Sequence, residues 1–195
     1  MNEGGKLAGG NPARGRAEND FYATHPDSTK ALLEVEKIIY PALEPACGEG
    51  HIAKLLDKET VATDLIYRGY GEGNIDFLKT NKQFYKEKYH IDFPQTIITN
   101  PPFNLFQEFV EKALEVANQK VIMFGKLQAL EGQKRATFLQ KTPLKTIYVF
   151  KKRQQPMRNG KSNDEITGKK MSSTMAFAWF VWKIGYIGKP QIEWI

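Results

Sequence analysis

The segment of this 195-residue chain most able to do chemistry is an asparagine followed by two prolines and a phenylalanine: Asn100, Pro101, Pro102 and Phe103. The apolar run 96–98 before it predicts a strand, and the prolines, which cannot donate main-chain hydrogen bonds, predict a rigid turn at its end. The asparagine oxygen and the Pro101 carbonyl then offer two acceptors beside the flat face of Phe103. That set suits a planar group carrying an NH₂ that stacks on the ring and donates both hydrogens. The alternative is an Asn-Pro turn that only starts a helix.

A second group of candidate residues surrounds a glycine turn earlier in the chain: Glu44, Pro45, Ala46, Cys47, Gly48 and Gly50. Glycines let the backbone approach a ligand closely, and the helical segment that follows offers unpaired N–H groups. The third glycine of the dinucleotide fingerprint is missing, which leaves dinucleotide binding open. No lysine follows as it does in a phosphate-binding loop, which argues against nucleoside triphosphate hydrolysis.

Carboxylates at the ends of predicted strands narrow the choice of ligand. Asp64 could accept hydrogen bonds from both hydroxyls of a ribose. Asp76 could accept one from an exocyclic adenine amine, with Phe77 against the purine face, and Glu44 could attract an α-ammonium group. Because three carboxylates would repel a polyphosphate, the cofactor they favour is a cationic amino-acid nucleoside, S-adenosylmethionine. Taken singly, each acid is better explained as a helix cap or a surface residue; their order at successive strand ends is what favours the cofactor.

The elements that must position these residues alternate between strands and helices. Strands are expected at 40–44, 60–64, 73–77, 96–100, 120–124, 146–150 and 175–182, with 191–195 as a further edge candidate, and helices at 26–39, 51–56, 105–117 and 132–140. This alternation predicts an α/β sheet of mostly parallel strands. Since no crossover helix separates 146–150 from 175–182, these two strands are expected to pair antiparallel at one edge.

Composition sets the class of protein. With 41% hydrophobic and 26% charged residues, the chain is expected to form one globular domain, residues 20–195, preceded by a flexible arm, residues 1–19. No apolar stretch is long enough to span a membrane and no signal peptide is recognisable, so a cytoplasmic location without membrane attachment is expected. The single cysteine and three scattered histidines lack zinc-ligand spacing, so no metal is expected.

Positive charge is concentrated in one segment. Residues 151–170 contain seven basic and two acidic residues, which accounts for +5 of the formal charge of +6. The basic residues are Lys151, Lys152, Arg153, Arg158, Lys161, Lys169 and Lys170. A basic loop on a near-neutral body indicates a polyanionic partner, and the glycines in 151–172 predict a flexible hairpin insert. The alternative is a solvated loop without a partner.

Taken together, these motifs resemble those of class I S-adenosylmethionine-dependent amino-methyltransferases, and most of all the DNA adenine-N6 methyltransferases of phages and prophages. The resemblance covers residues 20–195 and rests on the segments 21–26, 44–50, 63–65, 76–78, 100–103, 179–182 and 185–186. It implies a Rossmann-like methyltransferase fold: a mostly parallel seven-stranded sheet with an antiparallel edge strand and helices on both faces. It also implies that Phe21, Tyr22 and Thr24 pack over the methionine end of the cofactor, and that Leu65 joins Asp64 in binding it.

The function implied by the resemblance is methyl transfer to the N6 amine of adenine in DNA, by a phage- or prophage-encoded enzyme in the cytoplasm of a bacterial host. Because the target amine lies inside the duplex, the base must be flipped out. The chain has no room for a separate target-recognition domain, so the sequence recognised stays open. An RNA base amine or a protein glutamine amide also fits the acceptor motif, and a noncatalytic nucleic-acid-binding module is the third possibility.

Overall fold

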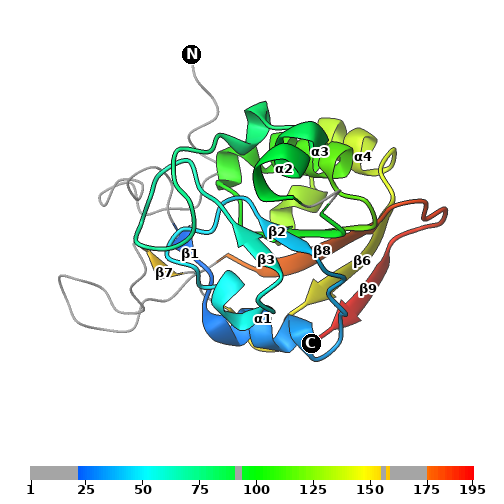
Figure 1. Ribbon diagram of the computed structural model, residues 1–195. Coiled ribbons are helices and arrows are strands. Elements are labelled where there is room, and N and C mark those ends of the chain that lie inside the picture. Colours follow the sequence, from blue (N-terminus) through cyan, green and yellow to red (C-terminus); the bar gives the residue numbers. More distant parts are fainter. Residues whose placement is uncertain (1–21, 91–93, 155–156, 159–174) are drawn as a thin grey trace, which may run out of the picture.

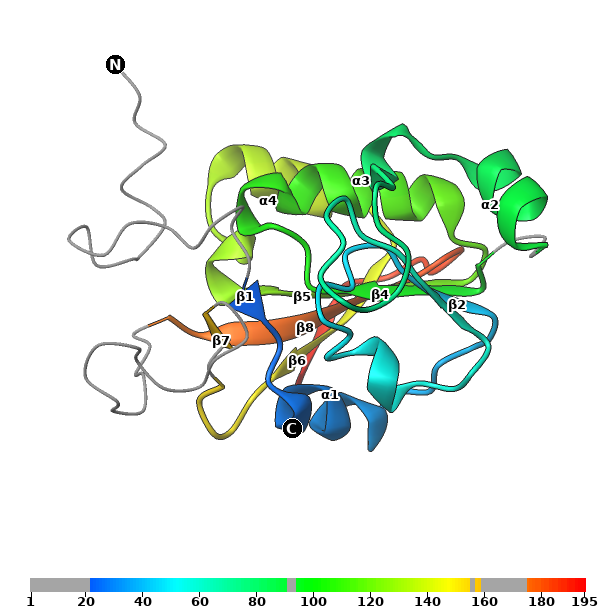
Figure 2. The same cartoon turned by 60° about the vertical axis from the view of Figure 1, so that its left-hand side comes forward.

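The computed structural model describes residues 22–90, 94–154, 157–158 and 175–195. Its centre is a seven-stranded sheet of order β3-β2-β4-β5-β8-β6-β9, with helices on both faces (Figure 1 and Figure 2). The predicted class of sheet is therefore confirmed. The predicted arm, together with Phe21, Lys161, Lys169 and Lys170, lies outside the described residues.

The strands of the large sheet are short. They are β2 (Ala42–Glu44), β3 (Thr60–Ala62), β4 (Thr96–Thr99), β5 (Lys120–Lys126), β6 (Leu144–Val149), β8 (Phe177–Lys183) and β9 (Gln191–Trp194). A separate antiparallel pair joins β1 (Tyr22–Ala23) to β7 (Met157–Arg158). The α-helices are α1 (Pro26–Leu33), α2 (Lys82–Tyr89), α3 (Phe106–Val116) and α4 (Gln133–Leu139), and the 3₁₀ turns are η4 (Ala53–Leu55), η5 (Phe77–Lys79), η6 (Phe103–Leu105) and η7 (Leu127–Leu130).

Side chains that alternate along the strands hold a helix layer on each face. In β4, Ile97 joins the hydrophobic cluster that contains Phe109 and Val110 of α3, whereas Ile98 joins the cluster that contains Leu32 of α1. Figure 2 shows α3 and α4 on one side of the sheet and α1 on the other. Because both faces are covered, the central strands are apolar without a polar side.

The antiparallel strand β8 lies inside the sheet. It pairs antiparallel with both β5 and β6, and β9, parallel to β6, forms the edge. The predicted antiparallel pairing of the 146–150 and 175–182 strands is confirmed. The prediction that this pair lies at the edge of the sheet is wrong, because β8 lies between β5 and β6, and β9 forms the edge. The reason is burial: residues 177–182 are all buried, and a strand covered on both faces needs neighbours on both sides.

Three predicted elements differ from the structure. The predicted helix 51–56 is only the 3₁₀ turn η4, which spans three residues. Residues 73–77 form no strand, because the segment 63–76 is a loop closed by backbone hydrogen bonds from Ile75 N to Asp64 O and from Asn74 N to Leu65 O. The predicted helix 26–39 ends at Leu33. Beyond it, the Glu36 side chain meets the buried Lys120 and Tyr148, which draws this segment onto the sheet. The departures at 73–77 and 26–39 come from tertiary contacts rather than from local sequence preference.

The order of the first strands creates the crevice in which the site lies. β2 lies between β3 and β4 and is parallel to both. The chain passes from β2 to β3 on one side and later returns to β4 on the other, so the connections diverge at the carboxyl ends of β2 and β4. Ligands of open α/β sheets bind at such a point. The predicted glycine turn follows β2 and the Asn-Pro-Pro-Phe segment follows β4, so both segments lie at this crevice.

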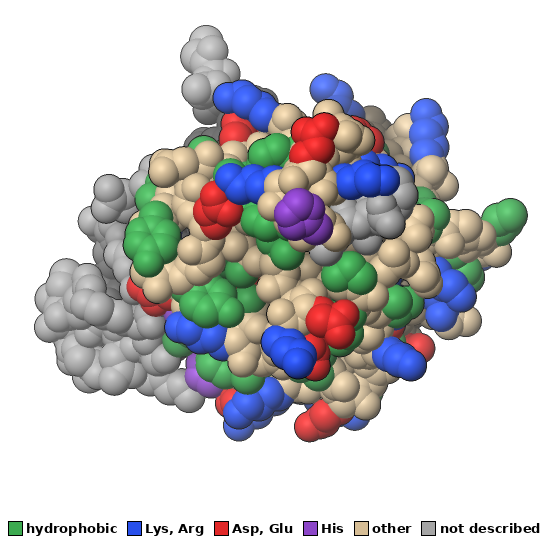
Figure 3. Space-filling model, viewed as in Figure 1, with side chains coloured by type: hydrophobic (Ala, Val, Ile, Leu, Met, Phe, Trp, Pro, Cys, Tyr) green, Lys and Arg blue, Asp and Glu red, His purple; other side chains and the backbone are tan. Residues whose placement is uncertain are grey.

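The surface carries charges of both signs. On the face drawn in Figure 3, Lys and Arg side chains are interspersed with Asp and Glu side chains. Within the described ranges, no helix has the length and apolar character that crossing a membrane requires.

Two glycines of the 63–76 loop test how tightly this loop is packed. Gly69 and Gly71 both have positive φ, +87° and +65°, so alanine at either position incurs backbone strain of about 1–3 kcal/mol. A Cβ at residue 71 would lie 2.6 Å from the Ala62 carbonyl oxygen, whereas one at residue 69 meets nothing within 4 Å. Gly71→Ala should therefore lower the free energy of unfolding in urea by roughly 1–3 kcal/mol more than Gly69→Ala. Equal losses would contradict the close packing of the loop.

Candidate active site

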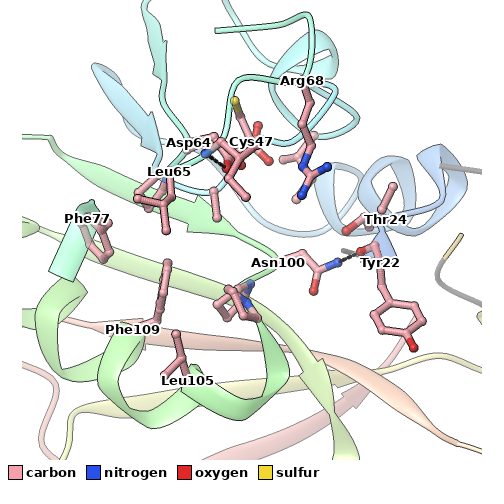
Figure 4. Close-up of a pocket in the computed structure, with 18 of the residues that line it drawn as sticks. Tyr22, Thr24, Cys47, Asp64, Leu65, Arg68, Phe77, Asn100, Leu105 and Phe109 are labelled. Carbon is pink, nitrogen blue, oxygen red and sulfur yellow. Dashed lines mark hydrogen bonds between the residues drawn. The ribbon is translucent and has the colours of Figure 1, made fainter. Parts of the chain in front are cut away.

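A cavity of about 490 Å³ opens at the carboxyl ends of β2 and β4. Its walls come from β1, the turn after β2, the 63–76 loop, the segment after β4 and α3 (Figure 4). Of the residues predicted to act, those that line it are Tyr22, Thr24, Glu44, Pro45, Ala46, Cys47, Asp64, Leu65, Asp76, Phe77, Asn100, Pro101, Pro102 and Phe103. The structure thus brings the predicted cofactor residues and the predicted acceptor residues to one cavity.

The two predicted glycines do not line the cavity; they shape its wall. Gly48 N donates a hydrogen bond of 2.8 Å to Asp64 Oδ2. Gly50 has φ +78°, and a Cβ there would lie 2.4 Å from the Tyr70 ring, so only glycine lets that ring cover the turn. Of the predicted basic residues, Lys151, Lys152 and Arg153 lie outside the wall and are exposed, and Arg158 belongs to β7.

Sequence reasoning missed part of the cavity wall. The additional residues are Ala23, His51, Ile52, Ile66, Arg68, Ile75, Leu78, Asn104, Leu105 and Phe109. His51 follows the glycine turn directly, so its place in the sequence could have indicated that it lies in the cavity wall. Phe109 lies in the predicted helix 105–117 and packs in the core, but the sequence gave no sign that it also faces the cavity. Arg68 carried no signal because the loop that presents it was predicted to run into a strand.

The two ends of the cavity differ in character. At one end Leu65, Phe77, Leu105 and Phe109 lie together, and the rings of Phe77 and Phe109 are 5.3 Å apart (Figure 4). At the other end lie Tyr22, Thr24, Arg68 and Asn100. The cavity therefore suits an elongated ligand with a flat apolar part and a polar part.

Asn100 is held in one orientation at the polar end. Its Nδ2 donates a hydrogen bond of 2.6 Å to the main-chain oxygen of Tyr22. Because a carbonyl oxygen can only accept, this bond determines which side of the amide carries the oxygen. Asn100 Oδ1 is buried and has no hydrogen-bond partner among the described residues. The cavity wall thus carries an oriented acceptor whose bonding capacity is unused.

Two more buried polar atoms of the wall are without partners within the described ranges, Thr24 Oγ1 and His51 Nδ1. Leaving a buried polar group unsatisfied costs about 1–3 kcal/mol. Three such atoms around one cavity indicate a ligand that brings its own donors and acceptors.

Asp64 and Asp76 each serve the fold as well as facing the cavity. Asp64 accepts hydrogen bonds from Gly48 N at 2.8 Å and from Ile66 N at 2.9 Å, which ties the glycine turn to the neighbouring loop. Asp76 caps η5 by accepting from Leu78 N at 3.2 Å, and it pairs with Lys79 at 3.0 Å. A carboxylate oxygen can accept more than one hydrogen bond, so these contacts are compatible with ligand binding.

Glu44 is a buried acid in the wall of the cavity, with 1% of its surface exposed. Burial raises the pKa of its carboxyl well above the usual value; the hydrogen bond from Ala53 N, 2.7 Å from Oε2, acts against this rise, and the nearby Asp64 adds to it. Its negative charge is therefore costly until a cation lies beside it.

Cys47 has the properties of a packing residue rather than a nucleophile. Burial, with the nearby Glu44 and Asp64, raises the pKa of its thiol to about 12. The thiolate, which is the reactive form, is therefore scarce at neutral pH.

The Phe103 ring belongs to an aromatic cluster. Tyr22 stacks beside it with ring centroids 5.8 Å apart, Phe177 lies at 5.6 Å, and Lys126 Nζ lies 4.8 Å from the ring centroid. A planar group that stacks on Phe103 must therefore fit among these side chains.

Comparison with solved structures identifies the fold. The chain is similar to a protein of Listeria monocytogenes assigned to the class I S-adenosylmethionine-dependent methyltransferases, with a TM-score of 0.57 and 11% identity over 98% of this chain and 69% of that one. It is similar to DrdV in a DNA complex, with a TM-score of 0.56 and 12% identity over 95% of this chain and 28% of that one. It is also similar to the M protein of the type I restriction enzyme EcoKI, with a TM-score of 0.52 and 12% identity over 86% of this chain and 44% of that one. The sequence matches no protein-family model and no curated protein.

At these identities the likeness shows the fold alone. The chain has the Rossmann-like fold of class I S-adenosylmethionine-dependent methyltransferases, as the motif resemblance implied. It spans less than half the length of DrdV and of the EcoKI M protein.

The buried Glu44 makes stability depend on pH. The unfolded chain releases this proton near pH 4.3, whereas the folded protein retains it to higher pH, so folding loses stability as pH rises through the raised pKa. Glu44→Gln remains neutral and can still accept from Ala53 N. Without ligand, the Tm difference between variant and wild type should be more positive at pH ~7.5 than at pH ~4.5. Glu59→Gln, at an exposed position before β3, is the control, and the same trend in both variants would contradict the assignment.

Proposed function

We propose that this protein is an S-adenosylmethionine-dependent methyltransferase that methylates the exocyclic N6 amine of adenine in DNA. The observation that carries the proposal is Asn100, whose amide is oriented by Tyr22 O and whose buried oxygen on the cavity wall has no hydrogen-bond partner within the described ranges. An amine that donates hydrogens is the complement of that oxygen.

The residues of the cavity fit the cofactor. The apolar end, with Leu65, Phe77 and Phe109, accommodates the adenine ring, and Asp64 accepts hydrogen bonds from the ribose hydroxyls. Glu44 faces the α-ammonium group, and that cation offsets the cost of its buried charge. When bound, S-adenosylmethionine supplies an electrophilic methyl group on a sulfonium centre.

The acceptor residues activate the target amine. The lone pair of the adenine N6 nitrogen is delocalised into the ring, which makes this nitrogen a poor nucleophile. Asn100 Oδ1 and the Pro101 carbonyl accept its two hydrogens, which pulls the nitrogen towards a tetrahedral geometry and frees the lone pair. The rate then depends on positioning and electrostatics, and the protein forms no covalent bond to the base.

Phe103 supports the flipped base. A base stacked between Phe103 and Tyr22 would need the two rings about 7 Å apart, and their centroids are 5.8 Å apart. A base between the two rings would therefore require them to move apart, and the Tyr22 main-chain oxygen that binds Asn100 takes no part in the ring contact.

DNA is the favoured acceptor for two reasons. The exposed Lys151, Lys152 and Arg153 follow β6 and can bind phosphates. Two proteins of similar structure are linked to DNA: DrdV is known in a complex with DNA, and the EcoKI M protein belongs to a type I restriction enzyme and is classed as EC 2.1.1.72. A tritiated-methyl assay that offers DNA, RNA and protein side by side tests the choice, and label in RNA or glutamine alone would overturn it.

Asn100→Ala should lower methyl transfer to DNA at least about 100-fold, because it removes an acceptor used in the transition state. S-adenosylmethionine binding, measured by calorimetry, should stay within about threefold, since Asn100 contacts the target and not the cofactor. Asn118→Ala, at an exposed position two residues beyond the end of α3, is the control and should leave both measurements unchanged. Equal loss of binding and transfer would show that Asn100 is structural.

Replacing Lys151, Lys152 and Arg153 together by glutamine should weaken DNA binding and flatten its dependence on salt. The slope of log K against log salt should fall by about 0.9 for each phosphate contact that is lost. The charge-matched control replaces the exposed Lys58, Lys134 and Lys141. An unchanged slope in the first variant would remove this segment from the DNA interface.

A further inference from the structure

We propose that Arg68, supported by Thr24, forms a subsite for the carboxylate of an amino-acid ligand, so that the cavity selects a zwitterion over the corresponding decarboxylated cation. This inference deepens the proposed function and rests on it. It concerns the polar end of the cavity, beyond the groups that face the adenine, ribose and ammonium parts of the cofactor.

The charges of the wall favour such a role for Arg68. Among the described residues that line the cavity, the acids are Glu44, Asp64 and Asp76, and Arg68 is the only Lys or Arg. Three carboxylates attract the ammonium and sulfonium charges of a ligand but repel its carboxylate. A guanidinium is the side chain best suited to binding a carboxylate, because its N–H groups match the two oxygens.

The position of Arg68 agrees with this role. Its side chain extends from the 63–76 loop towards the end of the cavity where Thr24 and Asn100 lie, away from the apolar end (Figure 4). The loop is held by the backbone hydrogen bonds of Asp64, Leu65, Asn74 and Ile75. Arg68 is therefore presented by a braced loop rather than by a free chain end.

Thr24 adds a donor at the same end. It is 2% exposed, and its Oγ1 is buried with no hydrogen-bond partner among the described residues. A hydroxyl in that condition can donate to a ligand oxygen. His51 Nδ1, which is also without a hydrogen-bond partner in the part of the chain that the structure describes, lies on the same cavity wall and can supply a further hydrogen bond.

Calorimetry with two ligands tests the subsite. S-adenosylmethionine and decarboxylated S-adenosylmethionine share the nucleoside, the sulfonium and the amine, and only the first has the carboxylate. The wild-type protein should bind S-adenosylmethionine about 10- to 100-fold more tightly than the decarboxylated form, as loss of a charged hydrogen-bonded contact predicts. Arg68→Gln should lose that preference by weakening S-adenosylmethionine binding alone, and Arg68→Lys should retain part of it.

Two further variants test the hydroxyl of Thr24 and control for the loss of an arginine elsewhere. Thr24→Val preserves the shape of the side chain and removes the hydroxyl, so it should reduce the preference without changing affinity for the decarboxylated form. Arg135→Gln is the control, because Arg135 lies on α4 and donates to Glu131 O outside the cavity. If Arg68→Gln weakened both ligands equally, or changed only DNA binding, the subsite would be overturned.

The result separates this inference from the proposed function. A wild-type protein that binds neither ligand would overturn the methyltransferase proposal itself. A wild-type protein that binds both ligands with equal affinity would leave that proposal intact and overturn the carboxylate subsite alone.

Discussion

The site depends on one hydrogen bond, from Asn100 Nδ2 to the main-chain oxygen of Tyr22. Without it, the amide could turn either way, and the cavity wall would present a donor as readily as an acceptor. The bond joins residues 78 positions apart in the sequence, so it exists only because β1 lies against the end of β4. The same bond leaves Oδ1 buried without a hydrogen-bond partner among the described residues, and a target amine would supply the missing donor.

A second constraint is electrostatic. Glu44, Asp64 and Asp76 converge on one cavity although like charges repel, and the fold tolerates them because each is tied to the backbone by hydrogen bonds from Ala53 N, Gly48 N and Leu78 N respectively. The pKa of Glu44 is raised mainly by burial, and the nearby Asp64 adds to the rise. A cationic ligand offsets the cost of the buried charge, so the stability of the protein without ligand is reduced by the same charges that favour binding.

Much of the sheet and most of the cavity wall follow from the sequence, because they depend on local patterns. The run 96–98 ending at two prolines defines the end of β4, and the glycines after β2 define a turn, so Asn100 and Glu44 are placed by strand ends alone. The 63–76 loop could not be predicted from the sequence. Its path depends on positive φ at Gly69, Gly71 and Asn74 and on contacts with β3 and Cys47. Because that loop carries Arg68, the position of this residue in the cavity wall could not be predicted from sequence patterns.

The position of β7 connects the two parts of the proposed activity. β7 follows the basic residues Lys151, Lys152 and Arg153 within a few positions, and it pairs with β1, where Tyr22 lies opposite Arg158. The strand whose carbonyl orients Asn100 is therefore held by the segment that carries the basic side chains. A two-residue pair has few hydrogen bonds of its own, so its geometry depends on what packs around it. Under the proposed function, phosphates bound at Lys151, Lys152 and Arg153 would lie close in sequence to the strand that pairs with β1.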